Sequence, residues 1–160
     1  MQSQAALANW IKALPVSKIN YPTRLQRHFF IWYTGRHESI RNALINLGVL
    51  KHTGRQVYLL GKIAKGVSIK QFVSYLIDKG YGNHFIAWKD DGEIASLRYT
   101  ENFKYQYHIR VFEDGEVRGH YEYTPEYRPI SHSRKIGQEA CREKFLSLLG
   151  DMIVPSTQTN

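Results

Sequence analysis

The chain has 160 residues, of which 42% are apolar, and its 22 Lys and Arg against 14 Asp and Glu give a formal net charge of +8. This composition excludes a disordered chain, and the lack of a fixed repeat excludes a collagen-like or coiled-coil rod. The single cysteine, Cys141, excludes an intramolecular disulfide and a zinc site of paired thiolates. Because the sequence has no membrane-length apolar run and no secretion-signal pattern at its start, we expect a cytoplasmic protein without membrane contact.

The positive charge is concentrated in the first part of the chain. Residues 1–70 carry eleven Lys and Arg and a single acid, Glu38, whereas residues 71–160 carry eleven basic and thirteen acidic side chains. Such a basic segment is typical of nucleic-acid-binding proteins, since it attracts a polyanion. We therefore expect a nucleic acid partner; the alternative is a basic surface that only aids solubility.

Three helices are predicted first, over residues 3–14, 22–33 and 34–47. We expect Pro22 to open the second helix, Gly35 to end it in a left-handed conformation, and Thr34 to cap the third. The spacing of apolar residues predicts the buried faces of the second and third helices: Leu25, Phe29 and Trp32 or Tyr33, and then Ile40, Ala43, Leu44 and Leu47. Two short segments, 49–52 and 56–60, are then predicted to form a hairpin.

Three helices followed by a basic hairpin is the element order of a winged helix-turn-helix. The stretch HESIRNALINLGVLKHTGRQVYLL resembles the recognition helix and wing of winged-helix transcription regulators, and the likeness extends over about residues 22–62. It indicates a fold and no particular family. The resemblance implies a DNA-binding domain over residues 1–66, with its third helix in the major groove and its hairpin against phosphates or the minor groove.

The third helix presents polar side chains opposite its predicted buried face. Arg41 is suited to guanine, Asn42 and Asn46 to adenine, and Ile45 to a thymine methyl group. The alternative is an ordinary solvated helix face, with Ile45 in an interface. Together with the wing and the second helix, the predicted DNA-binding residues are Arg24, Arg27, Arg36, Glu38, Arg41, Asn42, Ile45, Asn46, Lys51, His52 and Arg55.

The second part of the chain is predicted to be an α+β unit. A helix is expected over 68–80, between a Ser68 cap and a Gly80 stop. Two segments around Asp-Gly-Glu turns, 86–100 and 109–124, predict two hairpins or one antiparallel four-stranded meander. A final helix, about 135–152, is expected to pack on the sheet. We thus predict an α+β fold with a three-helix winged-helix-like domain (1–66), a domain for dimerisation, an effector or a partner (67–153) and a disordered tail (154–160).

The two faces of the last hairpin favour one register. A three-residue loop, 113–115, with Gly115 left-handed pairs Val111 with Val117 and His108 with His120, so that each face is uniform. The apolar face then holds Tyr107, Ile109, Val111, Val117, Gly119, Tyr121 and Tyr123. The polar face holds Gln106, His108, Arg110, Arg118, His120 and Glu122.

The polar face is the part of the sequence that points to chemistry. Two imidazoles and a carboxylate can hold a divalent metal, which makes His108, His120 and Glu122, with His132 further along the chain, candidate ligands. We nevertheless favour a solvated or partner-facing surface without metal or cofactor, because Arg110 and Arg118 would repel a cation.

The expected function is that of a small basic duplex DNA-binding protein, either a transcriptional regulator or another DNA-associated factor, that acts without catalysis. RNA and single-stranded DNA are possible ligands, and the second half is a possible homodimer or protein-partner surface. One alternative is a metal-dependent nuclease or other nucleic-acid-processing enzyme that uses the histidine face. Another is a subunit of a larger nucleoprotein assembly.

Overall fold

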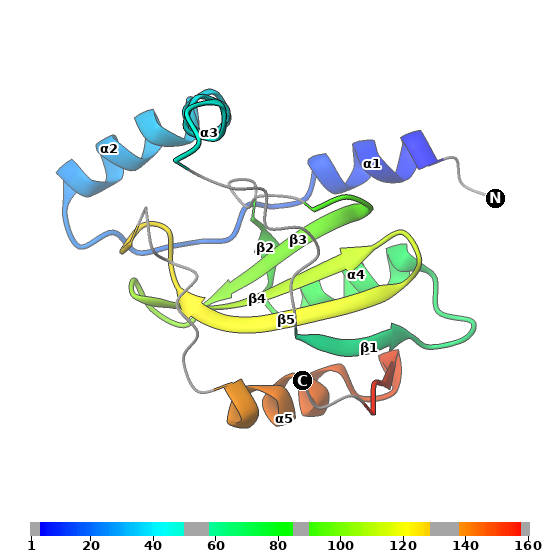
Figure 1. The fold of residues 1–160 in the computed structure, drawn as a ribbon. Coiled ribbons are helices and arrows are strands. Elements are labelled where there is room, and N and C mark those ends of the chain that lie inside the picture. The colour runs from blue at the N-terminus through cyan, green and yellow to red at the C-terminus, as the bar shows by residue number, and fades with distance from the viewer. Residues whose placement is uncertain (1–3, 50–57, 85–89, 129–137, 158–160) are drawn as a thin grey trace.

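The structure is a computed structural model that describes residues 4–49, 58–84, 90–128 and 138–157 (Figure 1). None of the described helices is long and apolar enough to cross a membrane. The elements in chain order are α1 (Gln4–Lys12), α2 (Arg24–Thr34), α3 (His37–Asn46), β1 (Leu59–Ile63), α4 (Ile69–Asp78), β2 (Gly82–Asn83), β3 (Glu93–Thr100), β4 (Tyr105–Phe112), β5 (Glu116–Tyr123), α5 (Gln138–Leu149), the 3-10 helix η1 (Gly150–Met152) and β6 (Ile153–Pro155).

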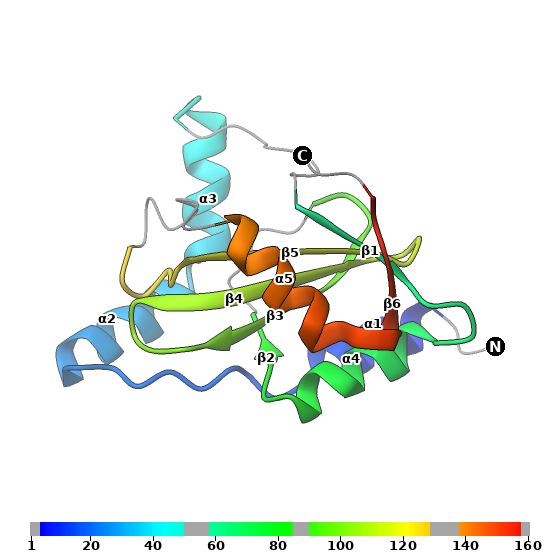
Figure 2. The same ribbon diagram turned by 90° about the horizontal axis from the view of Figure 1, so that it is seen from below.

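The fold is α+β, with an antiparallel sheet of six strands in the order β2-β3-β4-β5-β1-β6. Helices α4 and α5 cover its apolar face, where Phe72 and Phe145 join the strands in one hydrophobic core. Helices α2 and α3 lie on the opposite side of the sheet from α5 (Figure 1 and Figure 2). The predicted α+β class is therefore confirmed.

The predicted register of the β4–β5 hairpin is confirmed. Val111 pairs with Val117 and His108 with His120, and the loop residue Gly115 has a φ of +79°. Alternation of side chains along each strand then separates an apolar from a polar face. The predicted covering helix is confirmed as well, because Phe145 of α5 stacks edge-on against Tyr107 at a ring separation of 5.6 Å.

The ends of two predicted helices differ from expectation. Helix α2 is capped by Thr23, whose side chain accepts a hydrogen bond from the Gln26 backbone N–H, rather than opened by Pro22. Gly35 has a φ of −70°, so it is not a left-handed stop. Thr34 is the last residue of α2, and α3 instead begins after Arg36, which makes no side-chain cap bond. By contrast, the Ser68 cap and the left-handed Gly80 at the ends of α4 are confirmed.

The predicted buried face of α2 is wrong. Leu25, Phe29 and Trp32 are 79%, 51% and 50% exposed, whereas Phe30 is buried. The physical reason is that α2 projects from the sheet and meets the rest of the protein along a narrow strip. Phe30 contacts the ring of Tyr21 there, at a ring separation of 6.3 Å.

The segment expected to close the wing joins the main sheet instead. Residues 50–57 lie outside the described residues, and β1 lies between β5 and β6. Of the predicted wing strand 56–60, Leu59 pairs with Arg118 of β5, and the Leu60 carbonyl accepts a hydrogen bond from the Ser156 N–H. The winged-helix layout is thus not confirmed in the described residues.

Segments from both ends of the chain contribute to the same sheet and core. Ile11 of α1 and Leu14, which follows that helix, belong to the hydrophobic core formed with α4 and the strands. Val154 and Pro155, expected in a loose tail, pair with β1 as part of β6. The division at residue 66 stays a prediction about which parts fold independently.

Candidate functional site

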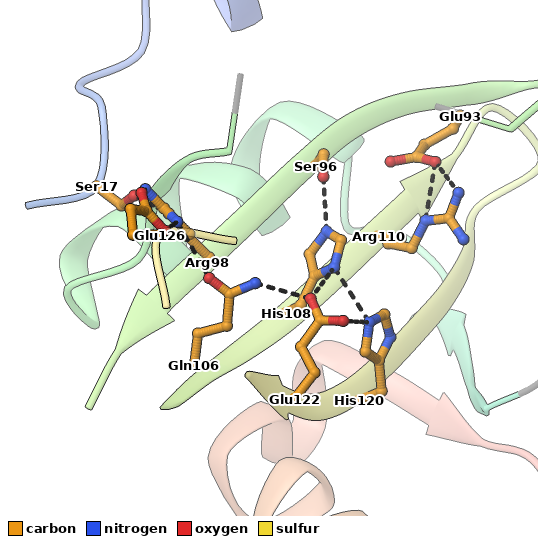
Figure 3. Close-up of polar contacts among 10 residues, drawn as sticks. All are labelled: Ser17, Glu93, Ser96, Arg98, Gln106, His108, Arg110, His120, Glu122 and Glu126. Atoms are coloured by element: carbon orange, nitrogen blue, oxygen red, sulfur yellow. Dashed lines mark hydrogen bonds and ion pairs between the residues drawn. The ribbon is translucent and has the colours of Figure 1, made fainter. Parts of the chain in front are cut away.

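Most side chains on the polar face of the sheet are buried, and Figure 3 shows their polar contacts. Gln106, His108, Arg110 and Glu122 are at most 6% exposed. Their neighbours on β3, Ser96 and Arg98, are 1% exposed. The expectation of a solvated surface is therefore wrong for these side chains, because other segments cover the face that alternation turns away from the apolar core.

His108, His120 and Glu122 converge on one point of this face, as the predicted register requires. His108 Nδ1 lies 3.3 Å from His120 Nε2 and 3.3 Å from Glu122 Oε1. Glu122 Oε2 lies 3.1 Å from His120 Nε2. The three side chains thus present their ligand atoms to one another, an arrangement able to hold a metal ion. The fourth candidate, His132, lies outside the described residues.

Two neighbouring polar side chains orient this triad (Figure 3). Ser96 Oγ is hydrogen-bonded to His108 Nε2 at 2.7 Å, on the side of the ring away from the triad. The Gln106 side-chain amide donates to Glu122 Oε1 at 2.7 Å. Both contacts come from positions that alternation places on the same face, so the strands fix the triad and its supports together.

The environment sets the protonation of the triad. Burial lowers the pKa of His108 to about 4, so its imidazole is neutral at pH 7. Burial by itself would raise the pKa of Glu122, but the charge of a protonated His120 and hydrogen bonds from both histidines hold it well below its usual range. The triad therefore combines an ionised carboxylate with at least one neutral imidazole.

The arginines beside the triad are neutralised by carboxylates of their own. Arg110 pairs with Glu93 through its Nε at 2.9 Å and with Asp90 at 2.8 Å. Arg118 pairs with Glu116. These carboxylates therefore offset most of the repulsion that the two arginines would exert on a cation in the triad.

A second buried pair links three segments of the chain. Arg98 and Glu126 form two hydrogen bonds, of 2.8 Å and 2.7 Å, and Arg98 Nε also donates to Ser17. Alternation along β3 predicts the side of the sheet on which Arg98 lies. Its partners Ser17 and Glu126 lie outside the strands, and no spacing in the sequence signals them.

An open cleft of about 570 Å³ adjoins this pair at the start of α2. Arg24 and Arg27, both predicted to contact DNA, line it together with Ile31 and with residues 16, 17, 19–21 and 23. Arg36 lies near the opposite end of α2, with its guanidinium 5.2 Å from the centre of the Trp32 ring. The structure thus brings two of the three basic side chains together and places the third separately.

The remaining predicted DNA-binding residues are on or beyond α3. Asn42 and Asn46 are exposed, but Ile45 is partly buried and Leu47, expected in the core, is 75% exposed. The predicted buried face of this helix is therefore wrong at Ala43 and Leu47, which are exposed, whereas Ile40 and Leu44 are partly buried. Glu38 and Arg41 lie on α3, and their side chains fall outside the described part of the chain, as do residues Lys51, His52 and Arg55 altogether.

Comparisons of the chain with protein-family models, with curated proteins and with solved structures found no match. The functional argument therefore depends on the chemistry of two features. One is the basic surface of the first 70 residues, and the other is the buried triad on the sheet.

Proposed function

We propose that the protein binds nucleic acid, with duplex DNA as the favoured form, through α2, α3 and the segment that precedes them. In this proposal it is a DNA-associated factor that regulates transcription without catalysis. Phosphate contacts position the protein, and exposed polar side chains of α3 read bases.

The observation that carries the proposal is the uncompensated positive charge of the first 70 residues. All eight of their described basic side chains are exposed, and none forms an ion pair with a carboxylate of the described residues: Lys12, Lys18, Arg24, Arg27, Arg36, Lys62, Lys65 and Lys70. The arginines on the polar sheet face, by contrast, are paired internally. Exposed charge without an internal partner is available to an external polyanion.

The start of α2 is the part of this basic surface where two arginines border one cleft. Arg24 and Arg27 lie one helical turn apart and border the same cleft, which suits two adjacent phosphates. The N-terminal end of a helix adds a partial positive charge at the same place. Asn42 and Asn46, exposed one turn apart on α3, are the candidates for base contacts.

Two triple variants with equal loss of charge test the proposal. The first replaces Arg24, Arg27 and Arg36 by Ala, and the control replaces Lys62, Lys65 and Lys70 by Ala. All six side chains are exposed, so neither variant is expected to change folding stability appreciably. Affinity for a duplex DNA, a single-stranded DNA and an RNA of the same length is measured by fluorescence anisotropy over a series of salt concentrations.

We expect the first variant to lose at least tenfold in duplex affinity and the control less than threefold. If each arginine contacts one phosphate, the slope of log K against log salt falls by about 2.7 in the first variant. Equal losses in both variants would show that net charge alone drives binding. Tighter binding of the single-stranded probes would replace duplex DNA as the favoured ligand.

A further inference from the structure

We propose that His108, His120 and Glu122 form a binding site for a divalent transition metal ion, with Zn²⁺ as the best fit. This inference goes beyond nucleic acid binding and does not depend on it. It follows from the spacing of three ligand atoms, the contacts that orient them, and the charge around them.

The separation of the two imidazole nitrogens, 3.3 Å, matches that of two ligands of one zinc ion. Bonds of about 2.0 to 2.1 Å place two ligands of a tetrahedral zinc ion roughly 3.3 to 3.4 Å apart. His108 Nδ1 lies 3.3 Å from His120 Nε2 and 3.3 Å from Glu122 Oε1, and His120 Nε2 lies 3.1 Å from the other carboxylate oxygen, Oε2. One ligand atom from each residue lies within 4.8 Å of the other two, so the three side chains can surround one ion once the Glu122 carboxylate turns one oxygen, or both, toward it.

The surrounding contacts are those that metal sites use. A histidine ligand commonly donates its other ring N–H to an oxygen, which fixes the tautomer. When an ion takes the place of the proton on His108 Nδ1, Ser96 Oγ, at 2.7 Å, is placed to accept from Nε2–H, and the lone pair of Nδ1 then faces the ion. Glu122 is likewise held, by the Gln106 amide. These two contacts orient both ligands before an ion arrives.

The charge balance favours a cation at this point. Glu122 is 2% exposed, and no Lys or Arg of the described residues forms an ion pair with it. The two histidines are its ion-pair partners in the described residues, and a divalent ion held between them would bring more positive charge to this buried carboxylate than an imidazole does. The nearest arginines on the same face, Arg110 and Arg118, are already paired with their own carboxylates.

The triad also leaves room for further ligands. Three protein ligands leave one tetrahedral position for water or another small ligand. The side chain of His120 is 20% exposed, so solvent reaches the cluster from that side. The ligand set of two imidazoles and one carboxylate, with no thiolate, favours zinc and similar first-row ions over Cu(I).

The test uses the full chain without a purification tag, stripped of metal by a chelator. Zn²⁺ is titrated in a calorimeter, and Co²⁺ is added separately because its visible absorption reports the coordination geometry. The variants are Glu122→Gln, which keeps the shape and removes the charge, and His120→Ala at the partly exposed ligand. The matched control is His28→Ala, since His28 is an exposed histidine on α2.

We expect one Zn²⁺ per chain, a tetrahedral Co²⁺ spectrum, and an affinity at least tenfold lower in both ligand variants than in the control. Far-UV circular dichroism establishes that each variant is folded. Should Glu122→Gln unfold, His120→Ala carries the comparison. The proposal is overturned if the unmodified protein binds no stoichiometric metal, or if a folded ligand variant binds it as tightly as His28→Ala does.

Discussion

The buried pair of Arg98 and Glu126 allows a quantitative test of how the protein is held together. Their side chains are 2% and 1% exposed and share two hydrogen bonds. Glu126→Gln keeps the size of the side chain but leaves the guanidinium without its counter-charge. Breaking a buried ion pair in this way costs about 3 to 5 kcal/mol. That loss is a large fraction of the roughly 5 to 15 kcal/mol by which a typical domain is stable.

Urea unfolding, followed by circular dichroism, measures the loss. A control variant, Glu143→Gln, changes an exposed carboxylate and should alter the free energy of unfolding by less than about 0.5 kcal/mol. The double variant Arg98→Met/Glu126→Leu removes both charges, so it should be more stable than Glu126→Gln, despite the lost contacts to Ser17 and Gln106. A cost below about 1 kcal/mol for Glu126→Gln would refute the reasoning, because it would mean that Arg98 finds solvent or another partner at little cost.

Two further predictions concern packing and pH. Gly119→Ala should destabilise the protein by about 1 to 3 kcal/mol in urea unfolding, since overpacking a filled core is costly. The new Cβ would lie 2.7 Å from Leu60 Cδ1 and 3.2 Å from Phe145 Cε1. The control Gly35→Ala should be tolerated, because Gly35 has a φ of −70° and the nearest atom to its new Cβ lies at 3.7 Å. Equal losses of stability in the two variants would contradict this packing. Burial raises the pKa of Tyr81, so the folded state keeps a phenol proton that the unfolded chain loses, and stability should fall as the pH rises above about 10. Tyr81→Phe should show a smaller alkaline loss in unfolding measured from pH 8 to 11, and an unchanged loss would contradict the assignment.

Local sequence patterns are sufficient to predict features that depend on residues close together in the chain. The cap and stop of α4 follow from Ser68 and Gly80, because caps satisfy backbone groups within a few residues. The hairpin register follows from the alternation around Gly115, because a shift by one residue would turn each side chain to the other face. The same register places His108 opposite His120 without any information about tertiary contacts.

Other features depended on contacts between distant segments. Periodicity identifies an apolar face of a helix but not whether another element covers that face. Leu25 and Leu47 are therefore predicted to be buried, but in the structure both are exposed. The pairing of β1 with β5 and β6 joins residues far apart in sequence, and no local signal favours it over a wing.

The triad of His108, His120 and Glu122 depends both on local sequence patterns and on tertiary packing. Alternation places His108, His120 and Glu122 on one polar face, but it carries no information about what covers that face. Burial of the triad and the pairing of Arg110 with Glu93 and Asp90 arise only when the chain is packed. Since burial and neighbouring charge decide whether such a face is a solvated surface or a ligand set, the chemistry of these residues is a property of the tertiary structure.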